Sequence, residues 1–250
     1  MPPRQTLLNW CDQTLQPQLF KDGAPNGLQV EGNDQIRHII TAVTASQAAI
    51  NHTITQGADT LLVHHGLFWR SEPTAIIGWK KQRIAALLAH NINLIGYHLP
   101  LDAHPTLGNN AQLAAKLNWQ PENTFSEQNL LNIGTLPENQ RTLAQLAQAI
   151  EQTLGRTPTI IGNPKQPLTR IAWCTGGAQW YFQAAIDADA DVYLTGEISE
   201  AQYHLANETD TAFIAAGHHA TERYGIQALG KALAQQFDVK VQFFDEHNPA

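Results

Sequence analysis

The sequence has few cysteines, few cations and no long apolar run, and each shortage excludes a class of protein. Two cysteines among 250 residues argue against a disulfide framework, so we expect a reducing, cytoplasmic compartment. Fifteen Lys and Arg against 22 Asp and Glu give a net charge of −7, which argues against a general nucleic-acid binder. The longest apolar runs, such as residues 84–89, fall far short of the roughly 20 residues that span a bilayer, so we expect no membrane partner.

Histidine is the one residue type in unusual supply, with eleven copies. The apolar content of 43% is ordinary for a globular protein, and this length allows one large domain or two modest ones. Histidine is the commonest metal ligand and titrates close to neutral pH. The segments in which histidines gather are therefore the first candidates for a functional site.

Strands and helices alternate along the chain. The apolar pattern predicts strands at 28–30, 38–43, 60–63, 93–97, 170–174, 191–194, 212–215 and 239–244. It predicts helices at 5–15, 46–56, 81–90, 109–117, 143–154, 178–188, 200–207 and 220–236. Such alternation is typical of α/β domains with mixed or parallel sheets. The polar stretch 121–139 predicts a boundary that leaves a first domain at 1–125 and a second at 126–250.

The two halves of the chain also resemble each other weakly. When residues 38–65 are moved onto 170–197, strand meets strand and helix meets helix, and identical residues include Asp59 with Asp191. One interpretation is a duplication, which predicts a pseudo-dyad and a site in the cleft between the halves. The other is the pattern that any two strand–helix–strand units share.

Three segments carry histidines and carboxylates, and each directly follows a predicted strand. Their members are His64 and His65; His98, Asp102 and His104; and His218, His219 and Glu222. Strand ends are where open α/β sheets build their binding sites. His218 and Glu222 are four residues apart at a helix start, which places both on one face, whereas His219 turns away by about 100°.

Imidazole and carboxylate without thiolate suit Zn, Fe, Mn, Co or Ni. The spacing favours five ligands, which are too many for one open catalytic zinc and suit two ions: His64, His65, Asp102, His218 and Glu222. Two close ions can generate hydroxide at neutral pH and polarise the bond under attack. Each residue also has a plainer interpretation, because a strand-end histidine is usually a surface or core group and Glu222 would complement a helix dipole.

Two further features leave alternatives open. Glu197 aligns with His65 when the halves are compared, so it is either an acid–base group or a helix-capping carboxylate. The sequence Thr175-Gly176-Gly177 follows a strand, and we interpret it as a tight turn rather than a phosphate-binding loop.

Seven segments carry a resemblance to a known family: APNGLQVEG at 24–32, VTASQ at 43–47, VHHG at 63–66, HLPLDAHPTLGNNAQLA at 98–114, AWCTGG at 172–177, TGEISE at 195–200 and AAGHHATERYG at 215–225. They resemble the GTP cyclohydrolase 1 type 2 homologue family, also called Nif-three-like or dinuclear metal centre proteins. The resemblance runs from about residue 20 to the C-terminus and is closest to the short bacterial form.

The resemblance implies two related α/β domains with mixed sheets and a dinuclear metal site in the cleft between them. It implies a ring-shaped homohexamer, a trimer of dimers. The family's ligands, which hold two divalent ions with Glu222 bridging, fall on His64, His65, Asp102, His218 and Glu222. The resemblance places His98 and His104 outside the ligand set. We expect His98 and Glu197 to be catalytic residues that move protons.

The family's name implies that GTP and water give formate and 7,8-dihydroneopterin triphosphate. We therefore expect a metal-dependent hydrolase with a nucleotide substrate. The cations nearest to the first ligand pair are Arg70, Lys80, Lys81 and Arg83, and Arg223 adjoins Glu222. The alternative is a non-enzymatic metal-binding regulator, metallochaperone or ring-shaped scaffold. A ring around DNA is a third hypothesis, and the net charge argues against it.

Overall fold

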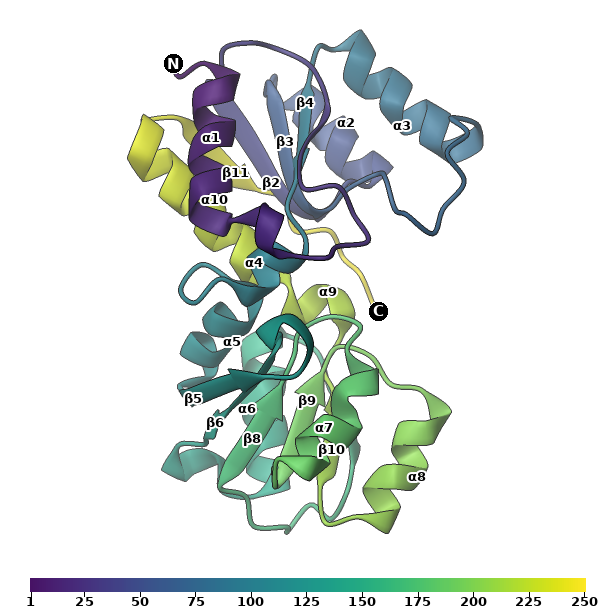
Figure 1. Cartoon of the computed structure of the whole chain (residues 1–250), viewed down its shortest axis with the longest axis vertical. Coiled ribbons are helices and arrows are strands. Elements are labelled where there is room, and N and C mark those ends of the chain that lie inside the picture. The colour runs from purple at the N-terminus through teal and green to yellow at the C-terminus, as the bar shows by residue number, and fades with distance from the viewer. The chain divides into compact units, whose positions relative to one another are not determined.

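The computed structural model describes all 250 residues and divides the chain into two compact units (Figure 1). The first unit comprises residues 1–108 and 225–247, and the second comprises 109–224 and 248–250. Each unit contains its own mixed sheet. None of the helices combines the length and the apolar character that crossing a bilayer requires.

The first unit contains a five-stranded sheet in the order β1-β4-β3-β2-β11. Its strands are β1 (Gly27–Val30), β2 (His38–Thr44), β3 (Thr60–His65), β4 (Asn93–Gly96) and β11 (Lys240–Phe243). All neighbours are parallel except β1, which pairs antiparallel with β4. In the register of β2 and β3, Thr44 lies opposite His65, so the carboxyl ends of these two strands lie side by side.

Helices cover both faces of this sheet (Figure 1). They are α1 (Arg4–Leu15), α2 (Gln47–Thr55), α3 (Gly78–Ala89), α4 (Leu99–Ala103) and α10 (Arg223–Phe237), with a 3-10 turn η1 (Pro17–Leu19). Ile39 packs in one core cluster with α1 and α10, and its neighbour Ile40 packs in another with α2 and α3. Successive strand residues point to opposite faces, so a strand covered on both faces is apolar throughout.

The second unit contains a six-stranded sheet in the order β5-β6-β8-β9-β10-β7. Its strands are β5 (Gln120–Phe125), β6 (Leu131–Thr135), β7 (Thr159–Ile161), β8 (Arg170–Trp173), β9 (Val192–Thr195) and β10 (Ala212–Ala215). The three strands β8, β9 and β10 are parallel to one another, whereas the other pairings are antiparallel.

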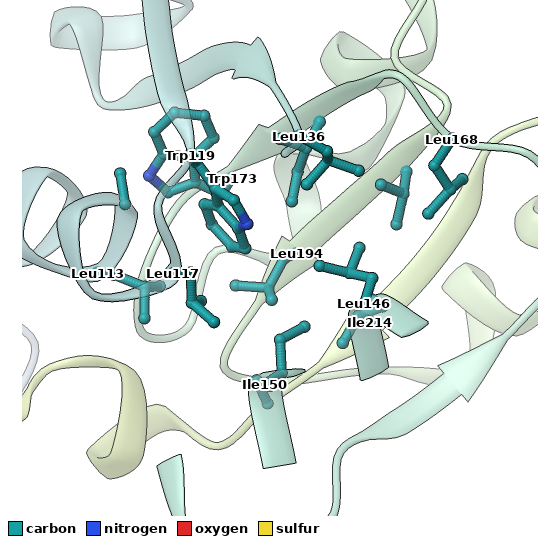
Figure 2. Packing of buried hydrophobic residues seen from close by; sticks show 14 of the residues in the cluster. Leu113, Leu117, Trp119, Leu136, Leu146, Ile150, Leu168, Trp173, Leu194 and Ile214 are labelled. Carbon is teal, nitrogen blue, oxygen red and sulfur yellow. The ribbon is translucent and has the colours of Figure 1, made fainter. Parts of the chain in front are cut away.

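The second unit has five α-helices, and one of its core clusters contains a tryptophan pair (Figure 2). They are α5 (Asn109–Leu117), α6 (Leu143–Leu154), α7 (Phe182–Asp187), α8 (Glu200–Glu208) and α9 (His218–Thr221), with 3-10 turns η2 (Glu127–Asn129), η3 (Glu138–Gln140) and η4 (Gln179–Tyr181). The rings of Trp119 and Trp173 lie 5.3 Å apart. Helix α6 begins with a capping box from Thr142 and ends at Gly155, whose left-handed backbone favours glycine.

The predicted α/β fold with mixed sheets is confirmed, but the division into units differs from the predicted boundary near residue 125. Helix α5 and strand β5 belong to the second unit, and residues 225–247 return to the first. They return because β11 pairs with β2 and because α10 packs against the same core cluster as α1. The polar stretch that predicts the boundary contains the β5–β6 hairpin, in which β5 is an exposed edge strand.

The two units share a detail that the alignment of the halves predicts. Asp59 Oδ2 accepts the backbone N–H groups of Arg37 and His38 at 2.9 and 3.3 Å. Asp191 Oδ2 accepts those of Thr169 and Arg170 at 2.7 and 2.8 Å. These positions correspond one for one, and each Asp precedes the second of two adjacent parallel strands. A strand–helix–strand unit does not require this contact, so its repetition favours a duplication.

Candidate metal centre

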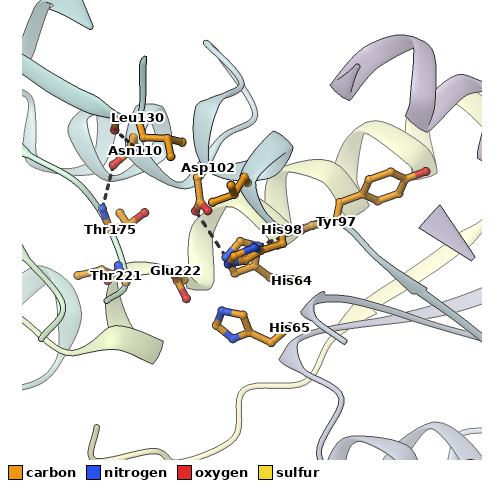
Figure 3. A network of polar contacts seen from close by, with 12 residues as sticks. His64, His65, Tyr97, His98, Asp102, Asn110, Leu130, Thr175, Thr221 and Glu222 are labelled. Atoms are coloured by element: carbon orange, nitrogen blue, oxygen red, sulfur yellow. Dashed lines mark hydrogen bonds and ion pairs between the residues drawn. The ribbon is translucent and has the colours of Figure 1, made fainter. Parts of the chain in front are cut away.

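Three histidines and one aspartate gather at the strand ends of the first unit (Figure 3). The ring centroid of His64 lies 4.5 Å from that of His65 and 5.1 Å from that of His98. The nitrogen atoms that the three rings offer as ligands lie within 4.8 Å of one another. Asp102 Oδ1 lies 3.5 Å from His64 Nε2. We call these four residues the histidine cluster.

The local fold explains why these side chains converge. His64 and His65 end β3, and His98 follows the neighbouring parallel strand β4. The chain leaves β3 at Gly66. The side chain of Gln29 lies so close to this residue that a Cβ there would overlap it, so the position requires glycine. Helix α4 begins after His98 and places Asp102 one turn later, where its N–H donates to the His98 carbonyl at 3.2 Å.

Each histidine of the cluster is held through Nδ1. His64 Nδ1 lies 2.9 Å from the carbonyl oxygen of Tyr97, and His65 Nδ1 lies 3.2 Å from Thr44 Oγ1. His98 Nδ1 lies 2.7 Å from Asp22 Oδ1. The Tyr97 carbonyl and the Asp22 carboxylate oxygen can only accept, so they place a proton on Nδ1 of His64 and His98 and leave Nε2 for a metal, which is the usual arrangement around metal-binding histidines. The chemistry of this donor set therefore fits a divalent metal ion.

Asp22 and Thr44 are the residues that the sequence did not identify. Asp22 precedes Gly23, and the sequence indicates only a turn there. Its carboxylate accepts hydrogen bonds from the N–H groups of Ala24 and Leu99, the amide of Asn26 and the ring of His98. No spacing rule links Asp22 to His98, because 76 residues separate them.

The second unit holds a smaller group, which we call the carboxylate pair: Glu197 and Glu222, with His218 between them. His218 Nε2 lies 3.1 Å from Glu222 Oε2, and His218 Nδ1 lies 2.6 Å from Glu197 Oε1. Glu222 is 2% exposed and follows α9. Glu197 follows β9, and the amide of Gln179 donates to its other oxygen at 3.3 Å. The i, i+4 spacing thus places His218 and Glu222 together as predicted.

The two carboxylates determine the charge of His218 in the metal-free protein. Burial alone would lower the pKa of this imidazole, but the hydrogen bonds and charges of Glu222 and then Glu197 outweigh burial and raise the pKa to about 9. We expect NMR titration of the metal-free protein to find His218 protonated at pH 7.5. Glu197→Gln should lower that pKa, whereas Glu200→Gln, at an exposed position on α8, should leave it unchanged.

The same shift predicts how stability depends on pH. Because the folded-state pKa is raised, protonated His218 stabilises the metal-free protein fully below about pH 6.5, and this contribution is lost as pH rises through 9. Urea unfolding at several pH values tests the direction of the change. A His218 pKa near 6.5 in the wild type would contradict both expectations.

The loop after β8 approaches the carboxylate pair closely. Gly176 has φ +72°, and a Cβ there would overlap Glu222 Oε1 and lie 3.2 Å from His218 Nε2. Its N–H donates to Thr221 Oγ1 at 3.0 Å, and its carbonyl accepts the N–H of Gly196 at 2.8 Å. The backbone groups of Gly176 are thus engaged within the fold, which supports the tight-turn interpretation over a phosphate loop.

The remaining candidates have other roles in the structure. His104 Nδ1 accepts the backbone N–H groups of Thr106 and Leu107, which stabilises the loop after α4. His219 is buried on α9. The Arg223 guanidinium donates to the carbonyl oxygen of Leu154 at 2.6 Å, at the end of α6.

The four cations after the first ligand pair separate into two groups. Arg70 and Lys80 line a cavity of the first unit. Lys81 is exposed, and the guanidinium of Arg83 lies 4.8 Å from the ring centroid of Trp79. Only the first two are therefore placed to contact a ligand in that cavity.

Comparison with known proteins finds similarity over almost the whole chain. Residues 3–249 match the family model described as Duf34/NIF3 (NGG1p interacting factor 3). A protein of Neisseria meningitidis serogroup B named GTP cyclohydrolase 1 type 2 homolog is 63% identical over 244 residues, which cover 98% of each chain. A Pseudomonas aeruginosa protein of the same name is 47% identical over 248 residues, again 98% of each.

Solved structures with the same fold cover the full chain as well. The protein ybgI, described as of unknown function, has a TM-score of 0.96 at 45% identity and covers 100% of both chains. TTHA1606 from Thermus thermophilus has a TM-score of 0.87 at 32% identity, with the same coverage. The similarity therefore includes both units and the segments that carry the histidine cluster and the carboxylate pair.

Proposed function

Because the chain belongs to the Duf34/NIF3 family, we propose that it is a metal-dependent hydrolase whose five candidate ligands hold two divalent ions. The ligands are His64, His65, Asp102, His218 and Glu222, with Glu222 shared by both ions. The observation that carries the proposal is the way in which hydrogen bonds at Nδ1 orient the histidine rings. Acceptors hold Nδ1 of His64 in the first unit and of His218 in the second, so a metal would take the Nε2 position of each ring and, at His218, replace the proton that faces Glu222 in the metal-free protein.

The metal ions, when bound, would lower the pKa of water and polarise the bond under attack. Nitrogen and oxygen ligands accept Zn, Fe, Mn, Co or Ni, so cellular supply selects the metal. The chain's own residues orient the ligands and move protons. Glu197 holds the His218 ring, and Asp22 holds the His98 ring. We assign proton transfer to His98, whose Nε2 faces the same cluster as His64 and His65.

The substrate that we propose is a nucleotide or a related purine. The relatives' name points to GTP, with formate and 7,8-dihydroneopterin triphosphate as products. The test is formate release from GTP by protein loaded separately with Zn, Mn and Fe, at about two metal ions per chain. We expect formate from the wild type and none from Glu222→Ala. Formate absent with both ions bound would reject GTP and favour a metal-handling or scaffold role.

The assembly that we propose is a homohexamer, a trimer of dimers, as the family resemblance implies. Light scattering of the purified protein measures its mass in solution. A mass of six chains is expected, and a monomer would contradict this part of the proposal.

Gly176 provides a test of the metal site that leaves every ligand in place. Gly176→Ala should weaken metal binding about tenfold or more, the range for residues that position ligands, because its Cβ displaces the Glu222 carboxylate. Gly177→Ala is the matched control, since a Cβ there would lie 3.4 Å from Glu197 in ordinary contact. Zinc competition against a chromophoric chelator measures both. Equal affinities would contradict the assignment of Glu222.

A further inference from the structure

A cavity of about 340 Å³ opens in the first unit next to the histidine cluster. Residues 22–25, residues 68–70 and 72–74, and Lys80 at the start of α3 supply its walls. The two wall segments are joined by a hydrogen bond of 2.7 Å from Arg70 N–H to the Gly23 carbonyl. The volume lies at the lower end of the range for small-molecule sites, so the cavity suits a metabolite rather than a polymer.

Two cations, Arg70 and Lys80, line the cavity. The ammonium group of Lys80 is buried, with the residue 5% exposed, and its Nζ lies 3.0 Å from Glu72 Oε2. A buried ammonium is costly unless it is paired, and here its carboxylate partner is 36% exposed. Arg70 is exposed at the rim and forms no ion pair within the chain. These two cations are a ready-made site for an anionic group such as a phosphate.

The acidic residues of the cavity do not cancel this character. Asp22 already accepts four hydrogen bonds, including one from His98. These bonds and the charge of His98 outweigh the effect of burial and hold the pKa of Asp22 well below its usual range. Glu72 pairs with Lys80, and its partial exposure lets it move aside for a ligand.

An aromatic ring that lines the cavity, that of Trp69, borders the histidine cluster. The Trp69 ring lies 5.0 Å from the His98 ring, edge to face, and 5.9 Å from the His65 ring. Lys80 instead contacts the Phe68 ring, at 5.7 Å, and Glu72. A ligand in the cavity can therefore place an apolar ring at Trp69, beside the histidines, and an anionic group at Lys80 and Arg70.

We propose that this cavity binds a phosphorylated planar ring, with the ring against Trp69 and the phosphate at Lys80 and Arg70. The assignment of this ligand as the substrate rests on the proposed function; the binding site itself does not. In this orientation the ring lies next to His65 and His98, and the phosphate ester does not. The protein then modifies the ring and leaves the phosphate attached.

Binding to the metal-free protein tests the site separately from activity. Isothermal titration with GTP, guanosine and tripolyphosphate should find GTP bound more tightly than either fragment. Arg70→Ala should weaken GTP and tripolyphosphate about tenfold and spare guanosine, since it removes a charge-assisted contact. Trp69→Leu should weaken GTP and guanosine roughly tenfold and spare tripolyphosphate, since it removes ring stacking.

Matched controls and a second cation variant sharpen the test. Lys81→Ala removes an exposed cation one residue from Lys80, and Trp180→Leu removes an exposed tryptophan of the second unit; both should bind GTP as the wild type does. Lys80→Met, which keeps the length of a buried side chain, should weaken tripolyphosphate as Arg70→Ala does. Thermal unfolding confirms that each variant is folded.

The outcomes separate this inference from the proposed function. Binding with the predicted pattern but no formate from metal-loaded protein would support the cavity and overturn the GTP cyclohydrolase reaction. Formate release with an unchanged KM in Arg70→Ala and Trp69→Leu would support the reaction and overturn the cavity. No binding of GTP by the wild type at millimolar concentration, or equal losses in the control variants, would also overturn the cavity.

Discussion

Glu222→Ala is expected to weaken metal binding by more than about 100-fold and to abolish turnover. Residues that only orient ligands cost 10- to 100-fold in metal affinity, and Glu222 is proposed to bind both ions itself. Its carboxylate is 2% exposed and lies 3.1 Å from His218 Nε2, so no mobile side chain replaces it. Metal content after gel filtration, measured by mass spectrometry, should fall from about two ions per chain to fewer than one.

Two variants control for this result. Glu222→Gln keeps the size of the side chain and should lose metal as Glu222→Ala does, because the amide lacks the negative charge. Glu200→Ala removes an exposed glutamate from α8 and should retain about two ions. A Glu222→Ala protein that keeps both ions would show that Glu222 is not a ligand.

Asp22→Ala is expected to lower the free energy of unfolding by about 3–5 kcal/mol, as when one partner of a buried charged pair is removed. Four donors lose their acceptor at once, among them His98 Nδ1 and the N–H of Leu99 at the start of α4. The Asp22 side chain is buried, so water does not replace the lost bonds freely. Asp34→Ala removes an exposed partner of Arg4 and should cost less than about 1 kcal/mol.

The effect of Asp22 should depend on pH in a defined direction. Burial would raise the pKa of its carboxyl, but the hydrogen bond and charge of His98 lower it further than burial raises it. A lowered folded-state pKa gives stability that is present above about pH 4 and lost as pH falls. Urea unfolding should therefore find the difference between wild type and Asp22→Ala shrinking in acid. A difference that is constant down to pH 3 would contradict this account.

The strands and helices that form the centre of each sheet were predictable from the sequence. Buried parallel strands such as β2 and β10 are short apolar runs, and helices such as α5 and α6 show a clear apolar face. The edge strands were not predictable. β5 is exposed and polar, and β7 has only three residues, so neither has an apolar pattern that distinguishes a strand from a loop.

The return of the C-terminal segment to the first unit could not be predicted. An apolar run at 239–244 predicts a strand but does not name its partner. The pairing of β11 with β2 depends on backbone hydrogen bonds between residues about 200 positions apart. The predicted boundary therefore cut the chain at one point, whereas strand pairing places the C-terminal segment in the first unit.

The candidate ligands were predictable because their signal is local. His64 and His65 follow an apolar strand, and His218 and Glu222 have helical spacing. The residues that orient them were not, because the contact between His98 and Asp22 joins distant segments through a turn. The cavity was not predictable either. The sequence does not show that Lys80 is buried and lines the cavity whereas its neighbour Lys81 is exposed.

We propose that the five candidate ligands hold two metal ions per chain. Diffraction from crystals of the zinc-loaded protein, recorded on both sides of the zinc absorption edge, tests it most directly. Two anomalous peaks per chain are expected, with donors from His64, His65, Asp102 and His218 and with Glu222 common to both ions. Peaks whose donors all come from one unit, or no peak at either ligand group, would contradict it.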